Sequence, residues 1–218
     1  RVYRELLAEG LIDDLVFCDV DKSRVKDLAG DDIRYTTDYR ELLTDGTIDA
    51  VDIVTPSKTH MSIGSEFLKC GKDVFVEKPM TTSSEEAEEF VRIAEESGRV
   101  LMVGHIFRYH PGINEIKNKI NKNEFGKIYY MDTKRTAFSS PRRDMGVLYA
   151  LGIHDVDLYC HLLGQDYPEK IECTRGKYLQ SDIEEIAHLD LFFKGGILCH
   201  AFESWMSPFS RKTREFTI

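Results

Sequence analysis

The chain has 218 residues, of which 42% are hydrophobic and 11% aromatic, so it is long enough to bury one large core or two smaller ones. Its formal net charge of -9 and isoelectric point near 5.3 argue against a nucleic-acid duplex or an anionic membrane as a partner. We therefore expect a globular protein with neither kind of partner.

No apolar run approaches the ~20 residues that a membrane-spanning helix needs, and the amino end does not resemble a signal peptide. The five cysteines are odd in number, lack C-x-x-C spacing and lie mostly in apolar segments. This pattern favours buried, reduced thiols over a disulfide framework or a thiolate zinc site. The sequence thus indicates a cytoplasmic protein.

The first segments of the chain have a strand-helix-strand rhythm. An apolar helical stripe ends at Gly10, residues 15–18 read as a strand closed by Asp19, and a second helix follows. In dinucleotide-binding folds, the acidic residue that binds the ribose lies ~20 residues after a glycine-rich turn. Counting back from Asp19 reaches a point just before Arg1, so we expect the first strand and its glycine loop to be missing from this chain. The alternative is that Asp19 only caps a turn or helix.

Short strand and helix signals follow over residues 34–37 and 39–43. A clearer strand over residues 50–55 ends at Pro56 and is followed by a helical pattern over residues 58–70. Backbone N–H groups at such a strand-to-helix turn favour anions, including a pyrophosphate. The turn holds the candidate cofactor-binding residues Thr55, Pro56, Ser57 and His60. An alternative for Ser57 is that it only caps the helix.

The stretch 73–80 contains an apolar run that ends abruptly in Glu77-Lys78-Pro79. The run is typical of a strand covered on both faces. Pro79 ends the strand pairing and biases Lys78 toward an extended backbone. Because ligands bind at the carboxyl ends of strands in open α/β sheets, we expect Lys78 to enter a cleft. The alternative is a solvated Glu77–Lys78 charge pair.

The remaining elements divide the chain into two halves. A capping-box pattern starts a helix near residue 83, and residues 100–108 read as the last strand of the first half. The later pattern is mainly β, with strands over residues 128–134, 170–178, 186–193 and 197–206, and one long helix over residues 147–163.

We therefore expect an α/β plus α+β fold. A doubly wound parallel sheet occupies residues 1–109, and a mainly antiparallel sheet with one long helix occupies residues 110–218. We expect the cleft between the halves to hold the chemistry.

The long helix carries His154, Asp157 and His161 at i, i+3 and i+7, which places them on one face. Neutral imidazoles and a carboxylate in that pattern could hold a metal ion. We expect no metal and keep metal binding on this face as an alternative.

Three motifs in this order resemble the Gfo/Idh/MocA oxidoreductase family: Glu77-Lys-Pro79, Gly104-His-Ile-Phe-Arg108 and the H-D-x-D segment that ends at Asp157. The resemblance covers nearly the whole chain, and the segments 141–147 and 204–208 are most similar to the family's UDP-N-acetylglucosamine 3-dehydrogenase group. It implies a Rossmann-type first domain. It also implies truncation at both ends, with the glycine loop lost in front and further strands lost behind Ile218.

The resemblance assigns roles to particular residues. Lys78 and His154 match the catalytic pair: the imidazole removes the proton of a secondary alcohol, while the lysine stabilises its oxygen. Asp19 matches the ribose-binding carboxylate, which favours NAD over NADP because it would repel a 2′-phosphate, and no arginine stands directly beside it in the sequence. The other matched cofactor-lining positions are Thr55, Pro56, Ser57, His60 and Glu77, and Lys78 is matched as a cofactor-lining residue as well as a catalytic one.

The implied substrate is a sugar or a nucleotide sugar, with the C3 hydroxyl of UDP-N-acetylglucosamine as the specific candidate. Guanidinium groups suit a diphosphate, although surface arginines are the alternative reading. The predicted substrate-binding residues are Arg108, Arg135, Arg142, Arg143 and Asp157.

One position departs from the family pattern. Family members commonly have an aspartate four residues before the histidine, where this chain has Ala150. The departure motivates an alternative in which the chain is a non-catalytic, dinucleotide-dependent sensor or assembly protein. We also expect a homo-oligomer formed through an exposed sheet face of the second half.

Overall fold

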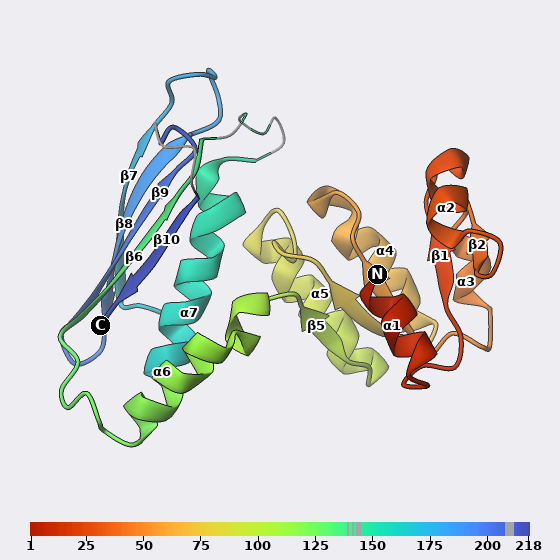
Figure 1. The fold of residues 1–218 in the computed structure, drawn as a ribbon, viewed down its shortest axis with the longest axis horizontal. Coiled ribbons are helices and arrows are strands. Elements are labelled where there is room, and N and C mark those ends of the chain that lie inside the picture. Colours follow the sequence, from red (N-terminus) through yellow and green to blue (C-terminus); the bar gives the residue numbers. More distant parts are fainter. Residues whose placement is uncertain (139, 141, 143–144, 208–211) are drawn as a thin grey trace. The chain divides into compact units, whose positions relative to one another are not determined.

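The computed structural model describes residues 1–138, 140, 142, 145–207 and 212–218. The chain forms two compact units, Arg1–Gly104 and His105–Ile218 (Figure 1). Each unit has its own sheets and its own hydrophobic cluster. The division that the sequence predicts lies slightly further along, near residue 109.

The first unit alternates strands and helices. Its elements are α1 (Val2–Ala8), β1 (Val16–Cys18), α2 (Lys22–Ala29), β2 (Arg34–Thr36), α3 (Arg40–Leu43), β3 (Ala50–Ile53), η1 (Ser57–Thr59), α4 (His60–Lys69), β4 (Asp73–Val76), α5 (Ser84–Ser97) and β5 (Leu101–Val103). Strands β1 and β2 pair in parallel, and β3, β4 and β5 form a second parallel sheet in that order. The predicted doubly wound parallel architecture is confirmed.

The core of the first unit lies between the sheet of β3, β4 and β5 and helices α4 and α5. Val74 and Val76 on β4 are buried against Phe67 of α4 and Phe90 of α5. The two helices approach closely at Gly64, where an added Cβ would lie 2.3 Å from the Phe90 ring. This packing holds the carboxyl ends of β3 and β4 side by side.

The second unit is a five-stranded sheet with two helices on one face (Figure 1). Its elements are η2 (Ile106–Tyr109), α6 (Pro111–Asn121), β6 (Tyr130–Thr136), η3 (Leu148–Gly152), α7 (Ile153–Leu163), β7 (Lys170–Gly176), β8 (Ile186–Phe193), β9 (Ile197–Ser204) and β10 (Thr213–Thr217). The strand order is β10-β6-β9-β8-β7, and only the β6–β9 pair is parallel. The mainly antiparallel second half is thus confirmed.

The core of this unit is formed by α7 and α6 against the inner face of the sheet. Leu158 and Leu162 of α7 pack on Met131, Leu191 and Ala201 of three neighbouring strands. These strand residues follow the two-residue alternation that points one side of each strand inward.

Some elements differ from the expectations. The strand predicted over 100–108 ends at Val103, because β4, its partner, has already ended at Val76. The sequence reasoning missed β10 and also α6, which begins with Pro111 in its first turn and is capped by the His110 ring accepting from the Gly112 N–H at 3.1 Å. Five residues near the start of the long predicted helix, Leu148–Gly152, form a π-helical turn.

The cysteines are all free thiols, but their burial was predicted incorrectly. Cys18, Cys70 and Cys173 are exposed, Cys160 is half-buried, and Cys199 alone is buried. In the described part of the chain, no helix combines the length and the apolar character that a membrane span requires.

Candidate functional site

The loops after β3 and β4 bring most of the predicted cofactor-site residues to one edge of a sheet. Because β3 and β4 are adjacent and parallel, their carboxyl ends lie together. Glu77 and Lys78 follow β4, where the Glu77 carboxylate accepts from the Lys78 N–H at 3.2 Å and the Lys78–Pro79 peptide bond is cis. Residues 55–60 follow β3.

Ser57 is not a helix cap in this turn. The N-cap residues are Pro56 for η1 and Thr59 for α4, and neither makes a side-chain cap bond. Thr59 instead donates from its hydroxyl to the Thr55 hydroxyl at 2.8 Å. The hydroxyl of Ser57 stays a predicted cofactor contact.

His60 links the two loops through main-chain atoms. Its ring is buried, with 1% of the residue exposed. Nδ1 lies 3.0 Å from the carbonyl oxygen of Pro79, and Nε2 lies 2.8 Å from the carbonyl oxygen of Thr55. Carbonyl oxygens only accept, so a ring N–H of His60 donates wherever one of these bonds forms. The ring nitrogens thus face main-chain oxygens of both loops, one of them next to Lys78, and direct contact of His60 with a cofactor stays a prediction.

Asp19 follows β1 at the end that faces the start of α2. Its carboxylate accepts from the Asp21 N–H at 2.9 Å, and its side chain is 23% exposed. Ribose hydroxyls donate hydrogen bonds and a carboxylate accepts them, so this group fits the ribose of a dinucleotide. The structure adds a neighbour that the sequence order hides, because Arg24 on α2 donates to Asp19 at 3.3 Å.

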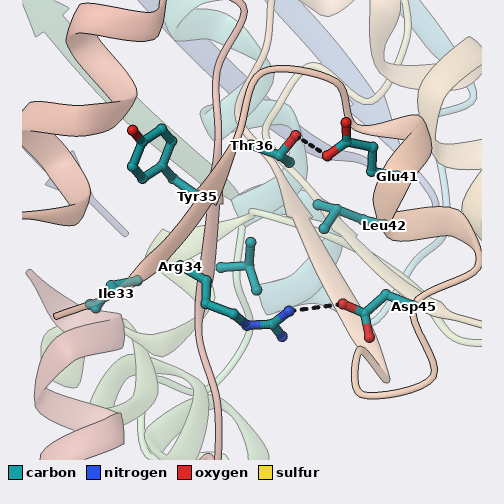
Figure 2. A pocket seen from close by; sticks show the side chains of 8 residues that line it. Ile33, Arg34, Tyr35, Thr36, Glu41, Leu42 and Asp45 are labelled. Carbon is teal, nitrogen blue, oxygen red and sulfur yellow. Dashed lines mark hydrogen bonds and ion pairs between the residues drawn. The ribbon is translucent and has the colours of Figure 1, made fainter. Parts of the chain in front are cut away.

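A cavity of about 350 Å³ in the first unit lies at β1, β2 and α3 (Figure 2). Its polar side chains pair with each other: Arg34 with Asp45 at 3.1 Å, and the Thr36 hydroxyl with the Glu41 carboxylate at 2.6 Å. None of the predicted site residues lines it. We therefore assign it no function.

In the second unit, His154 is the second residue of α7, directly after the π-helical turn. It is buried, and its ring meets the Phe107 ring edge-on at 4.8 Å between centroids. Single π turns in helices are frequent at functional sites. Ala150 lies within the π turn and packs in a small apolar cluster with Val147 and Trp205.

A buried ion pair supports the start of α7. The Arg135 guanidinium donates from Nε to both carboxylate oxygens of Asp155, at 2.7 and 2.8 Å. The guanidinium carbon also lies 4.3 Å from the centre of the Phe107 ring. Arg135 is only 6% exposed and its guanidinium is bound by Asp155, which leaves it little access to a diphosphate.

Glu203 on β9 lies beside this ion pair and is fully buried. Burial, followed by the hydrogen bond and charge of Asp155, raises the pKa of Glu203 to about 10. Neither carboxylate oxygen of Glu203 has a hydrogen-bond donor among the described residues. Burial and the neighbouring Asp155 therefore favour the neutral form of this carboxyl group, which lies under the helix that carries His154.

The other predicted substrate residues have mixed placements. Arg108 donates from Nε to both oxygens of Asp157, at 2.9 and 3.0 Å, so these two residues are brought together. The Arg142 carbonyl oxygen accepts from the Gln180 side chain at 3.0 Å, and Arg142 is exposed. Arg143 lies outside the described residues. Substrate contact stays a prediction for all four.

The metal alternative finds little support within the described residues. They contain no group of three or more His, Cys, Asp or Glu side chains that could hold a metal ion. Asp157, one of the three candidates, is engaged by Arg108.

The sequence reasoning missed the buried acids around the His154 helix. Glu184, just before β8, accepts from the Leu148 N–H at 3.2 Å and so caps the π turn. Glu203 alternates with Cys199 and Ala201 on the inner face of β9. That two-residue alternation was readable from the sequence and would have predicted a buried carboxyl group.

Comparison with known families matches both units. Residues 13–105 match "Oxidoreductase family, NAD-binding Rossmann fold", the first Gfo/Idh/MocA domain. Residues 113–218 match the "GFO/IDH/MocA C-terminal domain".

Among curated proteins, the chain is similar to UDP-N-acetylglucosamine 3-dehydrogenase of Acidithiobacillus ferrooxidans, at 38% identity over 55% of this chain and 37% of that protein. It is also similar to scyllo-inositol 2-dehydrogenase (NAD(+)) of Bacillus subtilis, at 36% identity over 61% of this chain and 40% of that protein. The chain thus spans about two fifths of these relatives' length.

Two solved structures share the fold. GenD2 from gentamicin A biosynthesis, in complex with NAD, matches with a TM-score of 0.86 and 26% identity, covering 93% of this chain and 61% of that one. The Acidithiobacillus ferrooxidans UDP-N-acetylglucosamine 3-dehydrogenase matches with a TM-score of 0.80 and 28% identity, covering 91% and 64%. With both domains matched in order, the chain belongs to the Gfo/Idh/MocA oxidoreductase family.

Proposed function

We propose that the protein is an NAD-dependent dehydrogenase that oxidises a secondary hydroxyl of a sugar or nucleotide sugar. The observation that carries this proposal is the joint presence of both family domains with a lysine after β4 and a histidine at the start of α7. The relatives named for oxidising an inositol and a nucleotide sugar support the same substrate class.

In this proposal His154 accepts the hydroxyl proton, and Lys78 orients the hydroxyl and stabilises negative charge on its oxygen. Asp19 binds the ribose of the dinucleotide, and residues 55–57 and 77 line the cofactor. The nicotinamide, when bound, accepts the hydride. His60 contributes indirectly, by holding the main chain next to Lys78.

The test is oxidation of a panel of inositols, simple sugars and UDP-sugars by the full-length protein with NAD. We expect Lys78→Ala and His154→Ala to lower kcat by about 10²- to 10⁴-fold with little change in NAD affinity. Lys69→Ala, at the exposed end of α4, and His161→Ala, further along α7, are the matched controls. Near-normal turnover by His154→Ala would refute the mechanism.

The panel also tests the finer assignment. Turnover of UDP-N-acetylglucosamine with a higher kcat/KM than any simple sugar would support the C3 hydroxyl of that substrate. A protein that binds NAD but oxidises nothing on the panel would favour the non-catalytic sensor, which the apolar setting of Ala150 motivates.

We further propose that the protein forms a homo-oligomer through the outer face of the five-stranded sheet. His188 stacks on Phe202 there at 4.5 Å, and Leu198 is exposed nearby. Sedimentation of wild type and Phe202→Lys would test this. A monomeric wild type, or an unchanged oligomer in the variant, would exclude this face.

A further inference from the structure

The helix that carries His154 rests on a charged part of an otherwise apolar sheet face. Arg135 on β6 and Glu203 on β9 are direct partners in the parallel β6–β9 pair. Asp155, on α7, reaches the same spot and is fully buried. Three ionisable side chains from three elements therefore meet beneath the start of α7.

The contacts at this spot form a closed chain that begins and ends at neighbouring residues. Asp155 binds the guanidinium of Arg135 with two bonds of 2.7 and 2.8 Å. The guanidinium lies 4.3 Å from the centre of the Phe107 ring, and Phe107 meets the His154 ring edge-on with an interplanar angle of 80°. Because His154 directly precedes Asp155, the carboxylate and the imidazole are tied to each other through Arg135 and Phe107 as well as through the backbone.

Glu203 packs beneath the π turn, next to this series of contacts. An added Cβ at Gly152, in the π turn, would lie 3.8 Å from Cγ of Glu203 and 3.2 Å from a Leu189 methyl group, so the turn sits directly on these side chains. Asp155 is also the neighbour that, after burial, raises the pKa of Glu203, so the two acids influence each other directly.

We propose that Arg135, Asp155, Glu203 and Phe107 form a positioning network that fixes the ring of His154. The inference rests on the proposed role of His154 as the base. Buried ion pairs contribute little net stability compared with apolar residues of similar volume, so stability alone does not account for this arrangement. Precise placement of a catalytic base accounts for the arrangement, because a shift of about 1 Å can cost about 10²-fold in rate.

The first experiment compares Phe107→Leu with Phe216→Leu in the full-length protein. Both phenylalanines are partly buried against the same apolar cluster, and each meets an aromatic ring of α7, His154 or Tyr159. Only Phe107 belongs to the network. We expect Phe107→Leu to lower kcat by about 10- to 100-fold with KM and NAD affinity within about twofold, and Phe216→Leu to leave kcat near wild type. Equal kcat values for the two variants would overturn the proposal.

The second experiment uses Glu203, which makes no direct contact with the His154 ring among the contacts described. Glu203→Leu should lower kcat, and the neutral donor in Glu203→Gln should restore most of it. In the double variant Glu203→Leu, Phe107→Leu, the loss should be smaller than the product of the single losses, because both act through one network. A loss in the double variant equal to the product of the two single losses would overturn the network.

A readout without turnover separates this inference from the proposed function. The His154 ring resonances, assigned by comparison with His154→Ala, should shift in Glu203→Leu and return in Glu203→Gln. Unchanged resonances in Glu203→Leu would overturn the network, even in an active enzyme. If no panel sugar is oxidised but the resonances behave as expected, the proposed function fails and the network stands.

Discussion

Replacing Glu203 by glutamine is expected to stabilise the second unit increasingly as the pH rises. The folded-state pKa of Glu203 is raised from 4.5 to about 10, first by burial and then by Asp155. Between these two values the folded state binds one proton more than the unfolded state. The stability of the wild type therefore falls with rising pH across this window, and the contribution is complete only below the unfolded pKa.

The size of the effect follows from the proton count. One extra bound proton changes the free energy of unfolding by about 1.4 kcal/mol per pH unit. Glutamine keeps a neutral donor near Asp155 but does not titrate. The difference in stability between Glu203→Gln and wild type should thus grow by about 3 kcal/mol from pH 6 to pH 8 in favour of the variant. Titrations of other groups occur in both proteins and cancel.

Urea unfolding followed by tryptophan fluorescence measures this directly, because the chain has one tryptophan, Trp205, which is 6% exposed next to β9. Glu185→Gln is the matched control, since Glu185 is equally buried and directly precedes β8 of the same sheet. Burial alone would raise the pKa of Glu185, but hydrogen bonds from the N–H groups of Tyr178 and Leu179 outweigh burial and lower it. Its contribution is present above the unfolded pKa, so Glu185→Gln should be destabilised by an amount that stays constant between pH 6 and pH 8. A constant difference for Glu203→Gln would refute the reasoning.

Three further predictions concern the cofactor, the loops after β3 and β4, and the substrate. Titration should give tighter binding of NAD than of NADP, and tighter NADP binding by the wild type would contradict the assignment of Asp19. Asp19→Ser should reverse the preference, because it removes the carboxylate and releases Arg24. His60→Ala should cost about 1–3 kcal/mol in stability and speed hydrogen exchange in residues 54–57 and 77–80, and unchanged exchange there would rule out the link between the loops. Arg142→Ala should raise KM for UDP-sugars about tenfold while leaving simple sugars unaffected, and an equal effect on both would remove the nucleotide-sugar argument.

Elements with a strong local pattern were predictable from the sequence. The apolar run before Glu77 became β4, and the helix that carries His154 was placed within a few residues. In both cases, periodicity and a stop residue act over a short stretch of chain. The π turn at Leu148 was not predictable in this way, because it depends on Glu184, which comes 36 positions later.

Side-chain partners across elements were the part that sequence reasoning could not supply. Arg135 looked like a substrate-binding arginine because its partner, Asp155, is 20 positions away and on another element. Arg24 was passed over beside Asp19 because the turn into α2, not sequence adjacency, brings them together. In each case the folded structure determines which group the charged side chain contacts. The sequence indicates only whether that side chain tends to face inward.

The link made by His60 also bears on how this chain can change over evolutionary time. The ring holds carbonyl oxygens of Thr55 and Pro79, atoms that every amino acid possesses. The other side chains of these loops are therefore not needed to hold the loops together. Mutations there can change the side chains that the two loops present while the main chain next to Lys78 keeps its place, so that one histidine gives the neighbouring positions freedom to diverge.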